Sequence, residues 1–361
     1  MIPKAIAIRG QKLSRAPVTI NPDRLRLGMV EANDTDRGID AASEFNDRSF
    51  GLIVFGVVSI LIGVFCALLV PLMFLSVALS KTVAGSGVDS RSAWSASALY
   101  GVMAVAFVWL GIGSIRARRW ACELLLSLSW IWLLTGICSV IIGVLAIPAV
   151  IRQFGAESAL PPEMALLVLV VTFGVISLLY IVLPGLFVLF YRSPHVAATC
   201  GARHPDPQWI DGCPRRLLTL MVVWVLLAVS ALLMPAYNFF FPFFGIVLTG
   251  AAGAVLWGLV LALCVALAVG TCRRASWAWW GGVVFTLGST FSSILVVLRF
   301  DLTQIMALMN LPEGQIAMMD SFSMIEGWVV ALGTFFAWGT FLVYLMTLRR
   351  YFAEAPSAAN G

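Results

Sequence analysis

The residues best suited to chemistry are two histidines and two cysteines in one polar segment, Ser193 to Arg216. His195, Cys200, His204 and Cys213 follow the pattern H-x4-C-x3-H-x8-C, and imidazole and thiolate are ligands that zinc prefers. The spacing lacks the closely paired cysteines of zinc fingers, and no H-E-x-x-H helix accompanies it. A cysteine nucleophile with a histidine base is a further option. Since three prolines and a glycine set turns here, we expect a linker without a cofactor, with zinc as the less favoured alternative.

A second polar cluster is the run GSTFSS at 288–293, within an otherwise apolar stretch. Small hydroxyl residues and glycine let membrane helices approach closely and hydrogen-bond across the contact. We therefore favour a packing role for these residues, and a polar path through the membrane is the alternative. The hydroxyl side chains concerned are Ser289, Thr290, Ser292 and Ser293.

The helices that must position these residues follow from composition. Hydrophobic residues make up 61% of the 361 residues and charged residues 11%, so the chain belongs in lipid rather than in water. A span needs about 20 apolar residues, and the long block 217–270 must fold back once, at Pro235 and Pro242. We predict an all-α, polytopic protein with eight transmembrane helices, at 50–79, 96–115, 124–147, 164–191, 217–234, 246–269, 277–298 and 327–348.

These predicted spans contain no Asp, Glu, Lys, Arg or His. Ionisable residues inside a membrane usually mark proton relays, ion pathways or catalysis. Their absence from the predicted spans argues against a proton-coupled pump or an intramembrane hydrolase. Phosphate-binding and nucleophile-elbow motifs are also missing from the sequence.

The basic residues predict the orientation, because lysine and arginine accumulate in cytoplasmic loops. Nineteen of the 23 lie in alternate segments: eight before the first span, three after the second, four after the fourth, two after the sixth and two after the last. We therefore expect an inner (plasma) membrane protein of the bacterial type with both termini in the cytoplasm. The expected anchors at the lipid headgroups are Arg116, Arg118, Arg119, Trp120, Arg273, Arg274 and Trp277.

The cysteines fit this orientation. Cys122, Cys200, Cys213 and Cys272 lie on the predicted cytoplasmic side and the other three lie inside spans. Thiols stay reduced in the cytoplasm, so we expect no disulfide.

Two segments outside the spans have their own interpretation. The mixed-charge residues 1–46 suit mobility and contact with anionic lipid more than with nucleic acid. The outer loop 299–326 holds five of the 13 methionines. Thioethers suit Cu(I), but an interfacial helix is favoured.

The sequence repeats itself. GSIRARRWA at Gly113 recurs as GTCRRASWA at Gly270, at an offset of 157. We therefore predict two tandem, parallel four-helix repeats, 47–192 and 207–351, with a linker loop at 193–216 and a cytoplasmic tail at 352–361.

Three functions are compatible with these features. The favoured one is a non-catalytic membrane component, a scaffold or partner subunit, working with a membrane protein partner or as a homo-oligomer. The second is a permease that passes a neutral or amphipathic small molecule or lipid along the seam between the repeats. The third is a membrane enzyme or metal sensor that uses the Cys/His loop.

Overall fold

The computed structural model describes residues 47–83, 90–157, 162–205, 213–300, 302–309 and 327–353. The chain divides into two units, Met1–Asn46 and Asp47–Gly361. The first unit, with the predicted lipid contact and mobility, lies outside the described residues, as do most of the methionine-rich loop and all but the first two residues of the tail.

Seven helical stretches in the described residues are long and apolar enough to cross a membrane. Large apolar side chains cover their outer faces: Leu61, Val105 and Leu189 are 60%, 72% and 72% exposed. Such surfaces suit lipid and not water, so the prediction of an all-α, multi-pass membrane-type protein is confirmed. The stretches are α2 (Ser49–Val83), α3 (Ser90–Ile115), α4 (Arg119–Glu157), α5 (Pro162–Ser177) continued by η1 (Leu178–Val182) and α6 (Leu183–Tyr191), α8 (Arg215–Ser230) continued by η2 (Ala231–Tyr237), α9 (Gly250–Cys272) and α10 (Ser276–Arg299).

The shorter helices are α7 (Pro194–Arg203), α11 (Leu302–Leu308), α13 (Gly327–Thr347) and α14 (Arg349–Ala353). Helix α13 corresponds to the eighth predicted span. Its described apolar part, Gly333–Thr347, is shorter than the other seven, so an eighth span stays a prediction. Helix α7 occupies 194–203, the first part of the predicted linker at 193–216, and the residues 206–212 that follow it lie outside the described ranges.

The break between the fifth and sixth spans contains a short β-hairpin. Strand β1 (Phe241–Phe243) pairs antiparallel with β2 (Ile246–Leu248), with Pro242 opposite Val247. The expectation that the sixth helix starts at Ile246 is therefore wrong, and α9 starts at Gly250. A short apolar run does not distinguish a strand from a helix, and the turn at Phe244 and Gly245, both with positive φ, folds Ile246 back onto β1.

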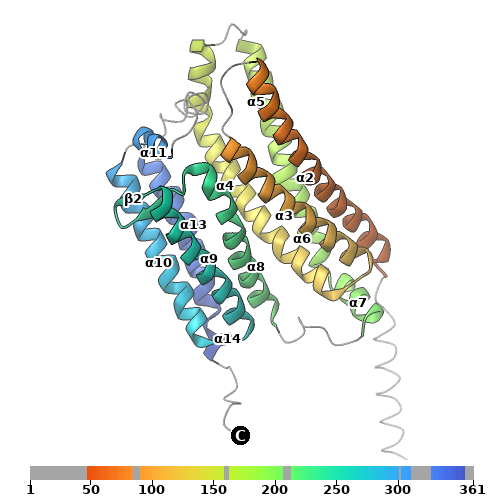
Figure 1. Cartoon of the computed structure of the whole chain (residues 1–361). Helices are drawn as coiled ribbons and strands as arrows, with labels where there is room; N and C mark the ends of the chain where they lie inside the picture. The colour runs from red at the N-terminus through yellow and green to blue at the C-terminus, as the bar shows by residue number, and fades with distance from the viewer. Residues whose placement is uncertain are drawn as a thin grey trace, which may run out of the picture. The chain divides into compact units, whose positions relative to one another are not determined.

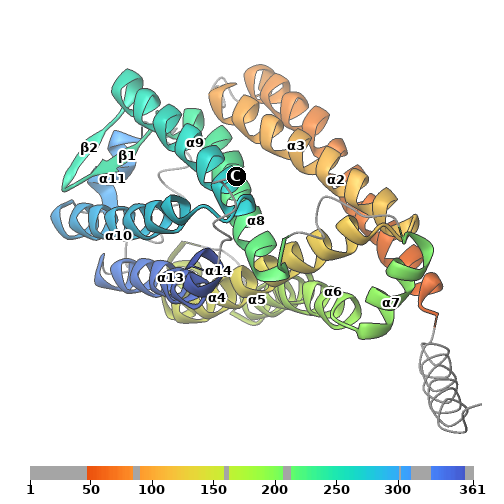
Figure 2. The ribbon, with the colours of Figure 1, turned by 90° about the horizontal axis from the view of Figure 1, so that it is seen from below.

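Each half of the described chain, α2–α6 and α8–α13, has its own apolar core. Buried residues such as Leu52 and Leu125 form one core, and Trp224 and Leu267 belong to the other. In the first half α2 packs on α3 and α4 on α6; in the second half α8 packs on α9 and α10 on α13. The halves meet where α4 contacts α8 and α3 contacts η2 (Figures 1 and 2).

The two arginine-rich hairpins have the same backbone geometry. Ala117 and Arg274 both adopt left-handed conformations, with φ of 50° and 54°. The Ala117 N–H donates to the Ser114 carbonyl at 2.8 Å, and the Arg274 N–H donates to the Thr271 carbonyl at 3.1 Å. The N–H of the next residue, Arg118 or Ala275, donates at 2.9 Å to the carbonyl of Gly113 or Gly270, five residues earlier. This is the Schellman pattern that ends helices. The local turn thus recurs at the offset of 157, whereas the four-helix repeat as a whole stays a prediction.

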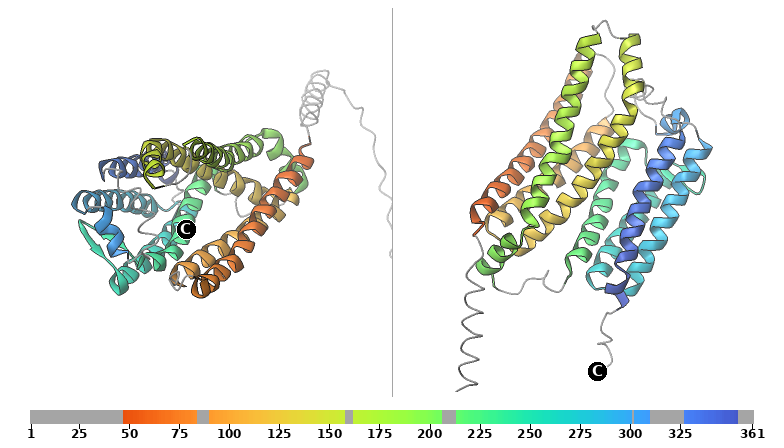
Figure 3. Two further views of the ribbon diagram at one scale, coloured as in Figure 1. Left: turned by 90° about the horizontal axis from the view of Figure 1, so that it is seen from above. Right: turned by 180° about the vertical axis from the view of Figure 1, so that it is seen from behind.

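Helices α7 and α14 lie at one end of the bundle, together with both hairpins, and the β-hairpin and α11 lie at the other (Figures 1 and 3). We call the first the arginine-rich end.

Candidate functional site

An apolar cavity lies in the second half, under the β-hairpin. Its volume is about 440 Å³, within the range of about 300–1,000 Å³ that is typical of small-molecule sites. Aromatic and aliphatic side chains form most of the wall, and serine hydroxyls lie along α10. We call it the hairpin pocket. Its lining includes Leu227 and Ser230 from α8, Phe241 to Phe244 from the hairpin, Trp257 and Val260 from α9, Gly288, Ser289, Ser292 and Ser293 from α10, and Trp338 from α13.

Side chains of the neighbouring helices hold the hairpin in place. The Ser292 hydroxyl donates to the Pro242 carbonyl at 2.7 Å and accepts the N–H of Phe244 at 2.9 Å. The indole N–H of Trp257 donates to the Phe240 carbonyl at 3.0 Å. Because these bonds satisfy backbone groups that a strand pair of three residues leaves open, they let a β-turn persist beside apolar helices.

The hydroxyl cluster predicted in GSTFSS is divided between two roles. Ser289, Ser292 and Ser293 line the hairpin pocket, whereas Thr290 donates within its own helix to the Thr286 carbonyl at 2.7 Å. The cluster therefore gives one wall of an otherwise apolar cavity its polar character.

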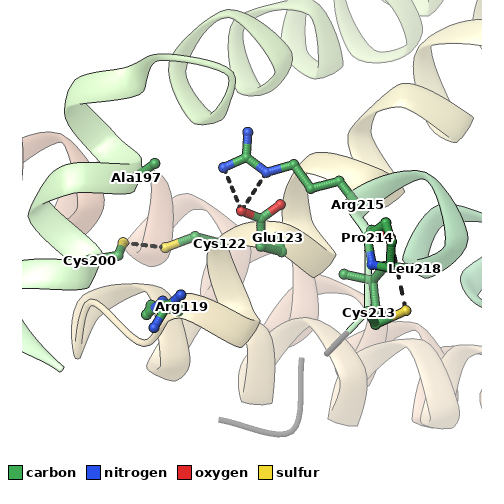
Figure 4. Close-up of a pocket in the computed structure, with 9 residues that line it drawn as sticks. All are labelled: Arg119, Cys122, Glu123, Ala197, Cys200, Cys213, Pro214, Arg215 and Leu218. Atoms are coloured by element: carbon green, nitrogen blue, oxygen red, sulfur yellow. Dashed lines mark hydrogen bonds and ion pairs between the residues drawn. The ribbon is translucent and has the colours of Figure 1, made fainter. Parts of the chain in front are cut away.

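The four predicted zinc ligands do not converge. Within the described ranges, no three His, Cys, Asp or Glu side chains gather so that they could hold a metal ion. His204 Nε2 is 2.9 Å from the Arg116 carbonyl oxygen, and His195 is partly buried at the start of α7. Of these four residues, Cys200 and Cys213 line one cavity, which Figure 4 shows.

That second cavity, about 310 Å³ in volume, lies at the arginine-rich end between α4, α7 and α8. We call it the thiol pocket. Cys122 and Cys200 meet on one side of it with their sulfur atoms 2.7 Å apart (Figure 4). Both thiols are buried, at 6% and 1% exposure. The sequence did not indicate Cys122 as a partner because it lies 78 residues before Cys200, on α4 and not in the linker. The only signal was that both cysteines were predicted on the same side of the membrane.

The surroundings of the thiol pocket shift the pKa values of Cys200 and Cys213 in opposite directions. A hydrogen bond from Cys122 lowers the pKa of the Cys200 thiol; burial and Glu123 oppose this effect, and Arg119 and Arg203 add to it. Burial raises the pKa of Cys213 to about 11. Since the thiolate is the reactive form, these opposite shifts favour the thiolate of Cys200 over that of Cys213.

The predicted headgroup anchors differ in exposure. Arg116, Arg118 and Arg273 are exposed, and Arg119 and Arg274 are half-buried. Trp277 is 53% exposed, but Trp120 is only 9% exposed and stacks on Trp109 at 4.3 Å between ring centroids. Trp120 therefore packs within the bundle, because α3 presents an aromatic partner that the sequence repeat does not reveal.

No protein family model, curated protein or solved structure matches this chain. Its architecture and its cavities are therefore the basis for a functional proposal.

Proposed function

We propose that the protein is a non-catalytic membrane component that holds a lipid-like amphipathic molecule in the hairpin pocket. One observation supports this proposal: a cavity of about 440 Å³ combines aromatic walls with a short row of serine hydroxyls. Apolar walls suit an acyl chain or a ring system, and a few placed polar groups give orientation.

The lining also limits the chemistry of the ligand. Among the described residues that line the hairpin pocket there is no Asp, Glu, His, Lys or Arg, so the buried part of the ligand is neutral. A buried charge without a partner would be strongly disfavoured there. A glyceride, a long-chain alcohol or the acyl region of a phospholipid meets these requirements.

The remaining parts of the proposal concern the membrane. We infer that the two halves arose as tandem four-helix units, supported by the matching turns at Ala117 and Arg274. We also infer that the arginine-rich end faces the cytoplasm of a cell with a bacterial-type inner membrane, since exposed arginines favour that side.

A glycine provides a direct test. A Cβ at Gly288, which lines the hairpin pocket, would meet no atom within 4 Å, so Gly288→Leu adds a branched side chain at the pocket wall without a clash at its Cβ. Gly258→Leu on α9 is the matched control, because its Cβ also meets nothing within 4 Å and it does not line the pocket. The probe is a diazirine-labelled fatty alcohol added to purified protein in detergent.

We expect the wild type and Gly258→Leu to crosslink the probe at pocket residues and Gly288→Leu to lose about tenfold or more of this signal, which corresponds to about 1.4 kcal/mol of binding free energy. Equal labelling of the two variants, or labelling spread over the lipid-facing surface, would overturn the proposal.

A permease is the second candidate, and one observation favours it. Cavities lie at both ends of the contact between the halves: the thiol pocket, and a cavity of about 410 Å³ lined by Arg91, Asn238 and Gly250 among others. Proteoliposomes with a fluorescent phospholipid distinguish the two functions. Protein-dependent exchange between leaflets supports a permease, and crosslinking without exchange supports a binding component.

A further inference from the structure

Helix α7 is fastened to the first half at the arginine-rich end. Arg203 Nη2 donates to the Ser49 hydroxyl at 2.6 Å, at the start of α2. His204 contacts the Arg116 carbonyl of the α3–α4 hairpin. Val196 is 1% exposed and belongs to the apolar core of that half. These contacts hold Cys200, in the middle of α7, in a fixed position over α4.

Cys122 lies in the first turn of α4, directly under Cys200. The separation of 2.7 Å exceeds the length of a disulfide bond, about 2.05 Å, by about 0.65 Å. No large backbone movement is therefore needed to join the two sulfur atoms.

The pair is buried within the protein and yet lines a cavity. Both cysteines are among the residues that line the thiol pocket, together with Arg119 and Glu123. A small, uncharged oxidant such as hydrogen peroxide fits easily into a space of about 310 Å³.

We propose that Cys122 and Cys200 form a reversible dithiol–disulfide pair that hydrogen peroxide oxidises. This site is independent of the hairpin pocket and of its ligand. Disulfides on the cytoplasmic side of a membrane are commonly transient and redox-sensing, which is consistent with thiols that are free at rest.

The chemistry balances in two steps. The Cys200 thiolate attacks one oxygen of the peroxide, the O–O bond breaks, and Cys200 becomes a sulfenic acid while hydroxide leaves and takes up a proton as water. The Cys122 thiol then loses its proton and its sulfur attacks Cys200, which breaks the S–O bond and releases a second water. In total the two thiols lose two electrons to the peroxide, and a dithiol reductant converts the disulfide back to two thiols.

The disulfide would change what the linker can do. In the reduced protein α7 is held by hydrogen bonds and apolar packing, which open and close reversibly. In the oxidised protein a covalent bond joins the linker between the two halves to α4, beside Glu123 and its ion pair with Arg215 on α8. Oxidation therefore restricts motion of α7 next to the contact between the halves.

The test uses the full chain, reduced and purified in detergent, then exposed to hydrogen peroxide. Remaining thiols are blocked with N-ethylmaleimide, and peptides are mapped by mass spectrometry. We expect one intramolecular Cys122–Cys200 link, a loss of two of the seven thiols, and recovery of both thiols with dithiothreitol. Amide hydrogen exchange in α7 should be slower in the oxidised protein.

Three alanine variants identify the roles. Cys122→Ala should stop at a sulfenic acid on Cys200, which dimedone traps, and Cys200→Ala should leave Cys122 unoxidised. Cys272→Ala is the matched control, because Cys272 is an exposed cysteine at the same end, and it should form the link as the wild type does. The proposal is overturned if the wild type forms no such link at a peroxide dose that oxidises Cys272, or if Cys213 is the partner instead.

Discussion

Arg215 in the first turn of α8 donates from Nε, at 2.8 Å, and from Nη2, at 2.7 Å, to a single carboxylate oxygen of Glu123 near the start of α4. One turn further on, the hydroxyls of Ser127 and Thr219 are 3.0 Å apart. The polar contacts between α4 and α8 are thus concentrated near the arginine-rich end, where the helices leave the apolar part of the membrane.

The ion pair between Glu123 and Arg215 should contribute little to stability. The Arg215 side chain is 57% exposed and that of Glu123 19%, so water and salt screen the attraction. A double-mutant cycle with Glu123→Gln and Arg215→Gln should give a coupling of about 0.2–1 kcal/mol. Thermal unfolding in detergent measures this coupling, and it should shrink at high salt. A larger coupling that salt does not affect would show that the pair is effectively buried.

The glycines of the two hairpins should be equally intolerant of a side chain. A Cβ at Gly113 would come within 2.6 Å of the Ala121 Cβ, and one at Gly270 within 2.7 Å of the Ala278 Cβ. Gly113→Ala and Gly270→Ala should each lower the free energy of unfolding by about 1–3 kcal/mol, as overpacking does. Gly101→Ala in α3 is the control, since its Cβ meets nothing within 4 Å, and it should be neutral or slightly stabilising. If alanine is tolerated at only one of the two glycines, the two turns are not equivalent in their packing.

These two hairpins also show what a sequence can predict. Glycine, arginine and tryptophan recur within nine residues, and such short-range patterns determine a turn and a helix end. Composition likewise predicts the membrane helices, because lipid requires long apolar segments.

The contacts between distant segments were not predictable in this way. The pairing of Cys122 with Cys200 and the stacking of Trp120 on Trp109 depend on how helices pack, and neither leaves a periodic signal. The strand that starts at Ile246 was not predicted, because a run of only a few apolar residues is compatible with either a strand or a helix.

Loss of the Ser292 hydroxyl should loosen the β-hairpin. Ser292→Ala removes the bonds to the Pro242 carbonyl and the Phe244 N–H, each worth about 1 kcal/mol. Amide hydrogen exchange at 241–248 should therefore be faster by roughly tenfold or more, and probe crosslinking in the hairpin pocket should weaken. Thr340→Ala is the control, because its hydroxyl bonds only within its own helix, to Phe336. Unchanged exchange would mean that packing alone holds the hairpin.

Cys272 should report the orientation in the membrane. It is exposed at the arginine-rich end, whereas Cys200 is buried, so Cys272 is the better target for an impermeant maleimide. In a variant that retains only Cys272, we expect no labelling in intact cells and strong labelling after permeabilisation, because the arginines favour the cytoplasm. A variant that retains only Cys138, on the lipid-facing surface of α4, controls for reagent partitioning. Labelling of Cys272 in intact cells would reverse the orientation.

The rate of alkylation by iodoacetamide should depend on pH differently at Cys200 and at Cys213. An ordinary cysteine has a pKa of about 8.5; the hydrogen bond from Cys122 lowers the pKa of Cys200, and burial raises that of Cys213 to about 11. The rate at Cys200 should therefore reach its plateau at a lower pH than an ordinary thiol, and the rate at Cys213 should still be rising in strong alkali. Cys122→Ala removes the donor, so the profile of Cys200 should move to higher pH, while Cys272→Ala should leave it in place. If the Cys200 profile is the same with and without Cys122, then the hydrogen bond does not activate this thiol.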